Sequence, residues 1–330
     1  HFMTLHPMWE NFPELQHDLQ KTVQLMEEIL HLKNKQVEAA ILEMIHSGGK
    51  LLRPAYQILF AQFGPEKEPE KIIALAAAIE LLHTATLIHD DIVDQADLRR
   101  NAPTIRSQFG NSTAVYAGDY LFVSCFKLMA DYATSMKSLQ MNSRSMEKIL
   151  AGELGQMDKH YYTEVSIEEY LENISGKTAE LFALSCSIGA LESGSSQLFA
   201  KKAAEIGHHI GMAFQMLDDI LDYSQASQKL GKPVLEDVRQ GIYSLPLLYA
   251  LKENPEDIKP ILAKKAAMTK EEAQTIFTLV HETNGLKNAQ VLAEEYTEKA
   301  LKEIAKLPNR PVGVKETLLE ITKMILHREN

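Results

Sequence analysis

The sequence is poor in the residues that cross-link chains or interrupt helices. It has only two cysteines, Cys125 and Cys186, which excludes a disulfide-rich secreted domain and favours a reduced, cytoplasmic protein. Its 16 glycines and 12 prolines in 330 residues fall well below the share of about 12% that these two residue types take in an average globular chain. No stretch alternates apolar and polar residues convincingly. We therefore predict an all-α fold with long helices and few turns.

The sequence also lacks a basic excess and a long apolar run. Its net charge of −11 argues against general nucleic-acid binding. An anionic substrate is not excluded, because metal ions and a few basic side chains can make a site locally positive. The most apolar run, residues 72–82, is too short to span a bilayer and contains Glu80. We expect neither a signal peptide nor a membrane-spanning segment.

The chain shows no clear linker, low-complexity tract or internal repeat. His1 and Phe2 before Met3 resemble a cloning scar, so we set residues 1–2 aside and expect residues 3–330 to form a single all-α domain. Apolar spacing and turn residues predict a helix from Pro54 to Gly64-Pro65 and others near residues 12–31, 35–47, 68–96, 104–109, 111–133, 136–159, 166–173, 176–192, 195–224, 234–252, 254–264, 269–282, 284–306 and 311–327.

An apolar helix that turns abruptly acidic stands out at residues 81–100. Asp90 and Asp94 are four residues apart, so on a helix they share one face a single turn apart. Like charges at this spacing repel, and folding alone gives no reason for them. A hard cation such as Mg²⁺ gives one, because it takes carboxylate oxygens and keeps part of its coordination shell for substrate phosphates.

The same Asp-Asp-x-x-Asp pattern returns at residues 218–222, far away in the sequence and again inside an apolar helix. Either motif alone could be a solvated acidic helix end, but the pair predicts a metal site. An EF-hand is excluded, since no loop of alternating Asp or Asn with a central Gly occurs. We expect the two helices to face each other and to hold metal and diphosphate between them. The predicted metal ligands are Asp90, Asp91, Asp94, Asp218, Asp219 and Asp222.

Residues 90–94, 98–100 and 218–222 together resemble the motifs of the trans-isoprenyl diphosphate synthases, or polyprenyl synthetases, and in particular the catalytic subunits of bacterial heptaprenyl and polyprenyl diphosphate synthases. Motifs in the family's order span residues 44–250. The resemblance implies a bundle of long, mostly antiparallel helices around a central cavity, the type I isoprenoid synthase fold. It also implies a prenyltransferase that uses three Mg²⁺ ions, or Mn²⁺, to condense isopentenyl diphosphate with an allylic diphosphate.

A glycine-rich basic segment, residues 48–54, is the next motif. Alone it could be a helix–loop–helix corner, but its glycines let the backbone approach a phosphate, while Lys50 offers a point charge and Arg53 a planar fork. His83 alone would more often be a core histidine, yet it lies two helical turns before Asp90. The resemblance implies that isopentenyl diphosphate is bound by Lys50, Arg53, His83 and Arg100, and that the allylic diphosphate is bound by Arg99, Lys177, Thr178, Gln215 and Lys232.

The resemblance further implies a reaction by ionisation, condensation and elimination. The residues that it assigns to catalysis are Asp90, Asp94, Lys177, Thr178, Gln215 and Asp218. The Gln215 carbonyl and the Thr178 hydroxyl would stabilise the allylic cation. The departing diphosphate would take the final proton, so no dedicated protein base is needed.

Product length depends on small side chains before the first acidic motif. Relatives that stop at farnesyl length carry an aromatic residue near Ala85 or Thr86, so these small residues predict an open path and a hexa- to octaprenyl product. Ala85 could also be there simply as a good helix former. In the helix after Gly118, the floor of the path could be formed by Phe122, Cys125 or Phe126.

Several alternatives stay open at this stage. The chain could make a shorter farnesyl or geranylgeranyl product, act as a class I terpene cyclase, or be a non-catalytic partner subunit. A terpene cyclase has no need of the basic pocket around Lys50 and Arg53, and its second motif usually differs. We expect a cytoplasmic homodimer or a heteromer with a small regulatory subunit, whose product could bring it to a membrane.

Overall fold

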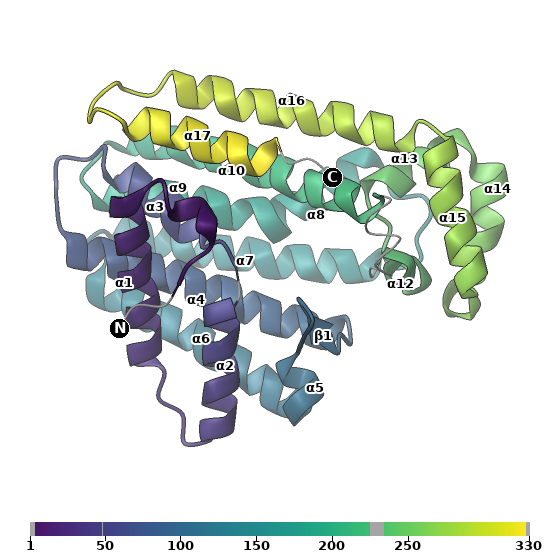
Figure 1. Cartoon of the computed structure of the whole chain (residues 1–330), viewed down its shortest axis with the longest axis horizontal. Helices are drawn as coiled ribbons and strands as arrows, with labels where there is room; N and C mark the ends of the chain where they lie inside the picture. The colour runs from purple at the N-terminus through teal and green to yellow at the C-terminus, as the bar shows by residue number, and fades with distance from the viewer. Residues whose placement is uncertain (1–3, 48, 225–233, 328–330) are drawn as a thin grey trace. The chain divides into compact units, whose positions relative to one another are not determined.

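A computed structural model describes residues 4–47, 49–224 and 234–327 (Figure 1). The described residues are helical except for one short hairpin and the connecting turns, so the predicted all-α fold is confirmed. The helices and strands have these bounds: η1 (Pro7–Trp9), α1 (Pro13–Ile29), α2 (Lys35–Ser47), α3 (Leu52–Ala61), α4 (Pro69–Val93), β1 (Leu98–Arg99), β2 (Ala102–Pro103), α5 (Ile105–Phe109), α6 (Asn111–Tyr132), α7 (Met136–Asp158), α8 (Ile167–Ile174), η2 (Ser175–Ala179), α9 (Glu180–Glu192), α10 (Gln197–Asp222), α12 (Val234–Arg239), α13 (Leu245–Glu253), α14 (Pro255–Leu262), η3 (Lys265–Ala267), α15 (Lys270–Glu282), α16 (Gly285–Ala305) and α17 (Val314–Leu326).

The chain divides into two compact units. Unit 1 comprises residues 1–142 and 185–203, and unit 2 comprises residues 143–184 and 204–330. The first acidic motif and the basic segment belong to unit 1, while the second acidic motif belongs to unit 2. The expectation of a single domain stays a prediction.

Helix α4 is the core of unit 1 and ends in the first acidic motif. It is apolar on all sides, which is typical of a buried helix, and it packs against α1, α3 and α6. By length and composition alone α4 could cross a bilayer, which the shorter apolar run seen in the sequence could not. However, 61% of its apolar window is buried within the protein, as in the core helix of a globular protein.

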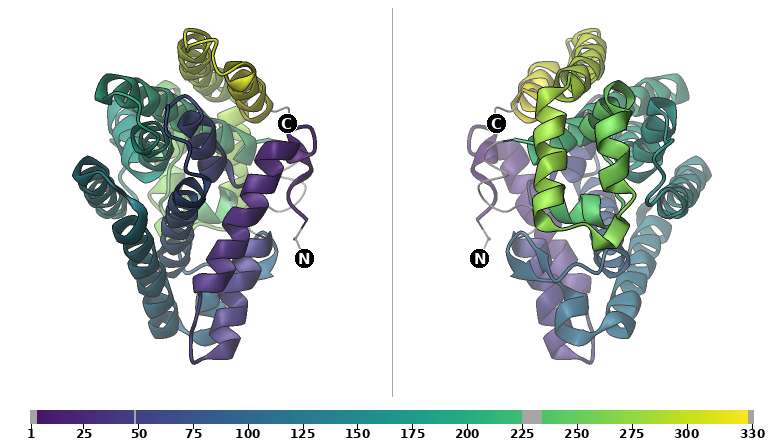
Figure 2. Two further views of the ribbon diagram at one scale, coloured as in Figure 1. Left: turned by 90° about the vertical axis from the view of Figure 1, so that its left-hand side faces the viewer. Right: turned by 90° about the vertical axis from the view of Figure 1, so that its right-hand side faces the viewer.

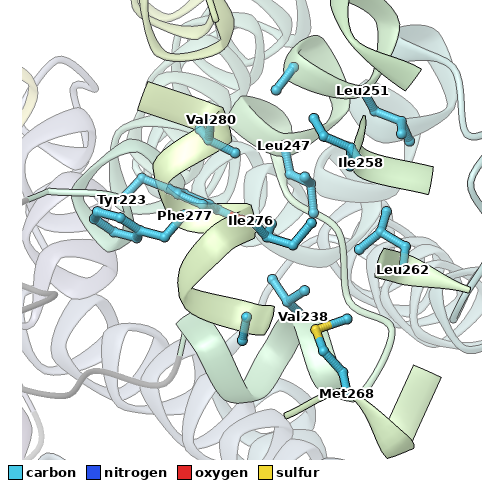
Figure 3. Packing of buried hydrophobic residues seen from close by; sticks show 12 residues of the cluster. Tyr223, Val238, Leu247, Leu251, Ile258, Leu262, Met268, Ile276, Phe277 and Val280 are labelled. Carbon is cyan, nitrogen blue, oxygen red and sulfur yellow. The ribbon is translucent and has the colours of Figure 1, made fainter. Parts of the chain in front are cut away.

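Unit 2 has its apolar core around α12, α13 and α15. Figure 3 shows the side chains of this cluster, in which the rings of Tyr223 and Phe277 stack with centroids 5.8 Å apart. A second cluster contains Tyr170, Met216 and Ile220 and so reaches the helix that carries the second acidic motif. Helices α16 and α17 lie side by side in Figure 1 and in both views of Figure 2.

Two predicted helices differ from the structure. The helix expected at 234–252 is interrupted between Arg239 and Leu245, because Gly241 has a φ of +85° and its carbonyl accepts a hydrogen bond from the Tyr161 amide at 2.9 Å. The acidic helix ends at Val93 instead of residue 96. Arg99 and Arg100 therefore do not continue it but lie on the β1–β2 hairpin.

Candidate active site

The first acidic motif forms the last turn of α4 in unit 1. The amide of Asp94 donates to the carbonyl of Asp90 at 2.8 Å, so the two half-buried carboxylates keep the one-turn spacing that the sequence predicts. Asp91 is different. It is only 4% exposed, and its two carboxylate oxygens accept hydrogen bonds from Arg99, whose Nε lies 3.1 Å from each oxygen and whose Nη2 lies 2.7 Å from Oδ1.

The second acidic motif, on α10 in unit 2, repeats this division. Asp218 and Asp222 are half-buried, whereas Asp219 is only 9% exposed. The Tyr170 hydroxyl donates to Oδ2 of Asp219, and Nε2 of Gln215 donates to Oδ1 at 3.0 Å. Burial raises the pKa of Asp219 to about 7 and outweighs these two hydrogen bonds, which lower it.

Each motif therefore has a middle aspartate that the protein itself holds and two outer aspartates on a less buried face. Pairs of carboxylates one helical turn apart offer the oxygen donors that a hard divalent cation prefers, so the donor set fits Mg²⁺. Asp91 and Asp219 already accept hydrogen bonds from protein groups, which favours a supporting role for them over direct coordination.

A cavity of about 240 Å³ lies beside the first motif in unit 1. Its wall brings together four predicted residues from two separate segments, α4 and the hairpin: His83, Asp91, Arg99 and Arg100. Glu80, for which the sequence predicted no role, also lines it. These groups combine arginine donors with neutral and acidic neighbours. The cavity can therefore receive an anionic group such as a diphosphate.

His83 lines this cavity, and Arg53, which does not line it, lies beside His83. Nη1 of Arg53 lies 3.4 Å from Nε2 of His83. Burial lowers the pKa of His83 well below its usual value, and the charge of Arg53 lowers it further. The ring is therefore neutral at neutral pH, so Nε2 accepts a weak hydrogen bond from the guanidinium and Nδ1 carries the proton.

The basic segment between α2 and α3 is held by a residue near the N-terminus of the chain. Trp9, which is fully buried, donates from its indole nitrogen to the carbonyl of Lys50 at 2.8 Å. Gly49 has a φ of +151°, and a Cβ at this position would lie 2.9 Å from Nη1 of Arg100. The segment favours glycine there because of this backbone conformation, since the Arg100 guanidinium, at the end of a flexible side chain, could move aside for a Cβ.

The β1–β2 hairpin explains why the side chains of Arg99 and Arg100 point in different directions. Arg100 and Asn101 both have positive φ, +52° and +64°, as in the tight turns that join two strands. Arg99 pairs with Ala102 and points its guanidinium at Asp91, while Arg100 lies at the turn against Gly49. The sequence predicted two different directions for these side chains, but the cause is this turn and not a helix end.

In unit 2 a second set of predicted residues meets. The Thr178 hydroxyl donates to Oε1 of Gln215 at 2.9 Å, which fixes the amide so that its NH₂ group faces Asp219. Nζ of Lys177 lies 3.0 Å from Oε1 of Gln156 and 3.7 Å from Glu153. Lys177 and Thr178 belong to η2, a π-helical turn, and such turns often occur at functional sites.

A smaller cavity of about 110 Å³ in unit 2 is lined by this network. Its wall includes Lys177, Gln215, Asp219, Tyr170 and Lys159. Tyr170 is a residue that sequence reasoning missed. It stands seven residues before Lys177, on the preceding helix α8, and nothing in the local pattern distinguishes it from a core tyrosine. Lys232 lies outside the described residues.

The predicted chain-length residues lie on α4 and α6, two helices of unit 1 that pack against each other. Ala85 is fully buried, and the Thr86 hydroxyl donates to the carbonyl of His83 at 2.6 Å. The Phe122 ring packs against His89 with centroids 5.3 Å apart, Cys125 is buried, and Phe126 is 45% exposed. None of the five lines the unit 1 cavity.

Comparison with known proteins identifies the chain. The family model described as polyprenyl synthetase matches residues 34–280. Heptaprenyl diphosphate synthase component 2 of Geobacillus stearothermophilus is 36% identical over 270 residues, which cover 82% of this chain and 83% of that protein. The family match, this relative and the helical fold all point to one class, the prenyltransferases with an all-helical isoprenoid synthase fold.

Solved structures agree over almost the whole length. Geranylgeranyl pyrophosphate synthase from Lactobacillus brevis matches with a TM-score of 0.94 and 42% identity, covering 98% of this chain and 99% of that one. Heptaprenyl diphosphate synthase from Staphylococcus aureus matches with a TM-score of 0.89 and 33% identity, covering 96% and 99%. The chain belongs to the polyprenyl synthetase family. The prediction of a prenyl diphosphate synthase, and hence of a prenyltransferase, is confirmed.

Proposed function

We propose that the chain is an all-trans polyprenyl diphosphate synthase that extends an allylic diphosphate with isopentenyl diphosphate to a hexa- to octaprenyl product. One observation carries the proposal: the two acidic helix ends share one design, with a protein-held middle aspartate and two outer carboxylates on a less buried face. The shared arrangement of aspartates supports the proposal that both motifs bind the same kind of ligand.

In this reaction the residues of the chain bind, orient and hold charge. Bound Mg²⁺, three ions in our proposal, would neutralise the leaving diphosphate and so promote ionisation of the allylic C–O bond. Asp90, Asp94 and Asp218 would supply carboxylate oxygens. The Gln215 carbonyl, oriented by Thr178, would face the positive charge that develops on the allylic carbon.

The unit 1 cavity would receive the homoallylic substrate. Arg100 and neutral His83, which line it, would bind its diphosphate together with Arg53, which lies beside His83, and with Lys50 of the basic segment. Arg99 would then act mainly through Asp91, which it holds, and Lys177 would bind the allylic diphosphate in unit 2. Holding both substrates in this way converts a bimolecular step into an effectively unimolecular one.

The proposed product length is supported by the small residue Ala85 and by the heptaprenyl synthases among the similar proteins. The geranylgeranyl synthase from Lactobacillus brevis supports the shorter alternative. The deciding experiment incubates the purified chain with farnesyl diphosphate, isopentenyl diphosphate and Mg²⁺ and separates the products by chromatography. Products of hexa- to octaprenyl length are expected, and a product that stops at geranylgeranyl would contradict the length.

The same assay tests the class of reaction. If diphosphate is released from the allylic substrate without isopentenyl diphosphate, the chain is a cyclase and the proposal is wrong. If elongation requires a second protein, the chain is one component of a heteromer, as the name component 2 of the Geobacillus relative suggests for that protein. A fully inactive chain in the presence of such a partner would indicate a non-catalytic subunit.

We propose further that the chain forms a homodimer. Two helices carry exposed apolar side chains at helical spacing: Val115, Tyr116, Val123 and Phe126 on α6, and Leu150, Leu154 and Met157 on α7. Exposed apolar side chains repeated along one helix favour a protein contact. Light scattering on the purified chain should give twice the chain mass, and Phe126→Asp should lower that mass. A monomeric wild-type chain would favour the heteromer.

A further inference from the structure

Glu80, in the middle of α4, is a half-buried residue whose carboxyl group the proposed reaction does not use. It lies on the wall of the unit 1 cavity, and its Oε2 atom is buried without a hydrogen-bond partner among the described residues. A buried polar atom left unsatisfied costs about 1–3 kcal/mol. Such an atom in a residue that lines a cavity therefore points to a ligand that completes the hydrogen bonding of the carboxyl group.

The titratable and charged groups around Glu80 come from the cavity wall and from α3. On the wall, Glu43 lies on α2, His83 and Asp91 lie on α4, and Arg99 and Arg100 lie on the hairpin. Arg53, on α3, does not line the cavity, but its charge acts on Glu80. Asp91 already forms an ion pair with Arg99, the His83 ring is uncharged, and the Glu43 side chain is exposed to solvent. The charges that act most on Glu80 are therefore the two arginines Arg53 and Arg100.

Burial raises the pKa of Glu80 to about 7, and the charges of Arg53 and Arg100 only partly oppose this rise. A diphosphate in the cavity would bring several negative charges close to the same carboxyl. Like charges favour the protonated form, so a bound diphosphate must raise this pKa further. An ionised Glu80 would repel the ligand, whereas a protonated one can donate to it.

We propose that Glu80 binds the diphosphate of the homoallylic substrate in its protonated form, donating a hydrogen bond from the carboxyl group to a phosphate oxygen. The proton comes from solvent, and no bond of the substrate is formed or broken. Binding in this cavity is therefore coupled to proton uptake. The inference rests on the proposed function, because it takes isopentenyl diphosphate as the ligand of the cavity.

The test is calorimetric titration of isopentenyl diphosphate into the whole chain, without metal or allylic substrate, so that no turnover occurs. The titration is run in several buffers that differ in ionisation enthalpy, and the slope of the observed heat gives the protons taken up. Wild type and Glu80→Gln are compared, because the amide keeps the shape of the protonated carboxyl but cannot titrate. The diphosphate's own protonation contributes equally to both and cancels in the difference.

With a free-state pKa of about 7, wild type should take up about 0.9 proton more than E80Q at pH 8 and only about 0.1 more at pH 6. The wild-type Kd should rise about fivefold between pH 7 and pH 8, because the protonated fraction falls by that factor, while the Kd of E80Q stays flat. Glu43→Gln, an exposed carboxylate at the same cavity, should behave like wild type.

Equal proton uptake by wild type and E80Q at both pH values would overturn the inference. If neither protein binds isopentenyl diphosphate, the assignment of the cavity fails instead, so the two failures are distinct. Should E80Q not fold, the wild-type pH dependence decides alone: a Kd that does not change between pH 7 and pH 8 contradicts proton uptake.

Discussion

Arg99 and Asp91 form a bidentate ion pair, with 2.7 Å between Nη2 and Oδ1, although they stand on different elements. The pair ties the β1–β2 hairpin to the last turn of α4. Because the Asp91 side chain is almost fully buried, the pair is shielded from water on that side. It therefore places both arginines of the hairpin at the cavity and keeps Asp91 away from the outer face of the motif.

The first prediction separates the aspartates within this motif. Asp91→Asn should lower the free energy of unfolding by about 1–3 kcal/mol, because it leaves Arg99 without its buried anion. Asp90→Asn, at the less buried aspartate, should cost less stability than Asp91→Asn in the absence of metal and should lower activity by at least about 100-fold. Urea unfolding with and without Mg²⁺, together with steady-state rates, checks both. Equal loss of stability in the two variants would contradict the division of roles.

The second prediction concerns the Tyr170 hydroxyl. Tyr170→Phe removes one of the two hydrogen bonds that hold Asp219, so Gln215 loses a fixed partner. We expect kcat to fall about tenfold or more, with a smaller change in the KM of isopentenyl diphosphate, because we propose that the Gln215 carbonyl faces the allylic carbon. Tyr249→Phe, a half-buried tyrosine in the same unit, is the matched control and should leave kcat unchanged. An equal effect of the two variants would show a merely structural role.

The third prediction concerns Trp9, the only tryptophan of the chain. Trp9→Phe keeps the aromatic ring but loses the hydrogen bond to the Lys50 carbonyl. We expect the KM of isopentenyl diphosphate to rise by about threefold to tenfold, with little change in kcat, because the bond is worth about 1 kcal/mol and positions only the basic segment. The wild-type indole fluorescence should also change when isopentenyl diphosphate is added. A rise in the KM of the allylic substrate instead would contradict this role.

The fourth prediction uses the pKa of Glu80 in the absence of ligand. Its ordinary value is 4.5, and burial raises it to about 7 in the folded chain. Between these values the folded chain keeps a proton that the unfolded chain has released, so stability falls as the pH rises from 4.5 to 7 and is level above. Glu80→Gln should lack this fall, which amounts to about 2–3 kcal/mol. Urea unfolding of wild type, E80Q and Glu43→Gln at pH 5 and pH 8 measures it, and parallel curves for wild type and E80Q would contradict the prediction.

The fifth prediction concerns product length. Ala85 is fully buried on α4, so Ala85→Phe should fill space within unit 1 and shorten the product. Overpacking should also cost about 1–3 kcal/mol of stability. Chromatography of the products checks the length, with Ala85→Ser as a control that should keep the wild-type length. An unchanged product in a folded Ala85→Phe variant would show that this residue does not set the length.

Much of the chemistry was readable from sequence because it depends on local spacing. The one-turn spacing of Asp90 and Asp94 follows from helix geometry alone, and the structure keeps it. The apolar spacing around both motifs predicted helices for the same reason. The resemblance of the motifs was enough to predict the family, which the comparisons confirmed. Product length was harder to predict from sequence, because Ala85 gives only the size of one side chain and not the course of the path for the growing prenyl chain.

Other features depended on contacts between residues far apart in the chain. Local spacing cannot reveal that Asp91 is held by Arg99, that Tyr170 holds Asp219, or that Trp9 supports Lys50, because each pair joins separate elements. The break at Gly241 was missed since helical periodicity continues through it, while the contact with Tyr161 comes from another segment. By itself the sequence determined the helices, the acidic motifs and the class of reaction. Only the tertiary structure decided which aspartates the protein holds and which buried carboxyl faces the cavity, because burial and charge depend on every element that packs around a side chain.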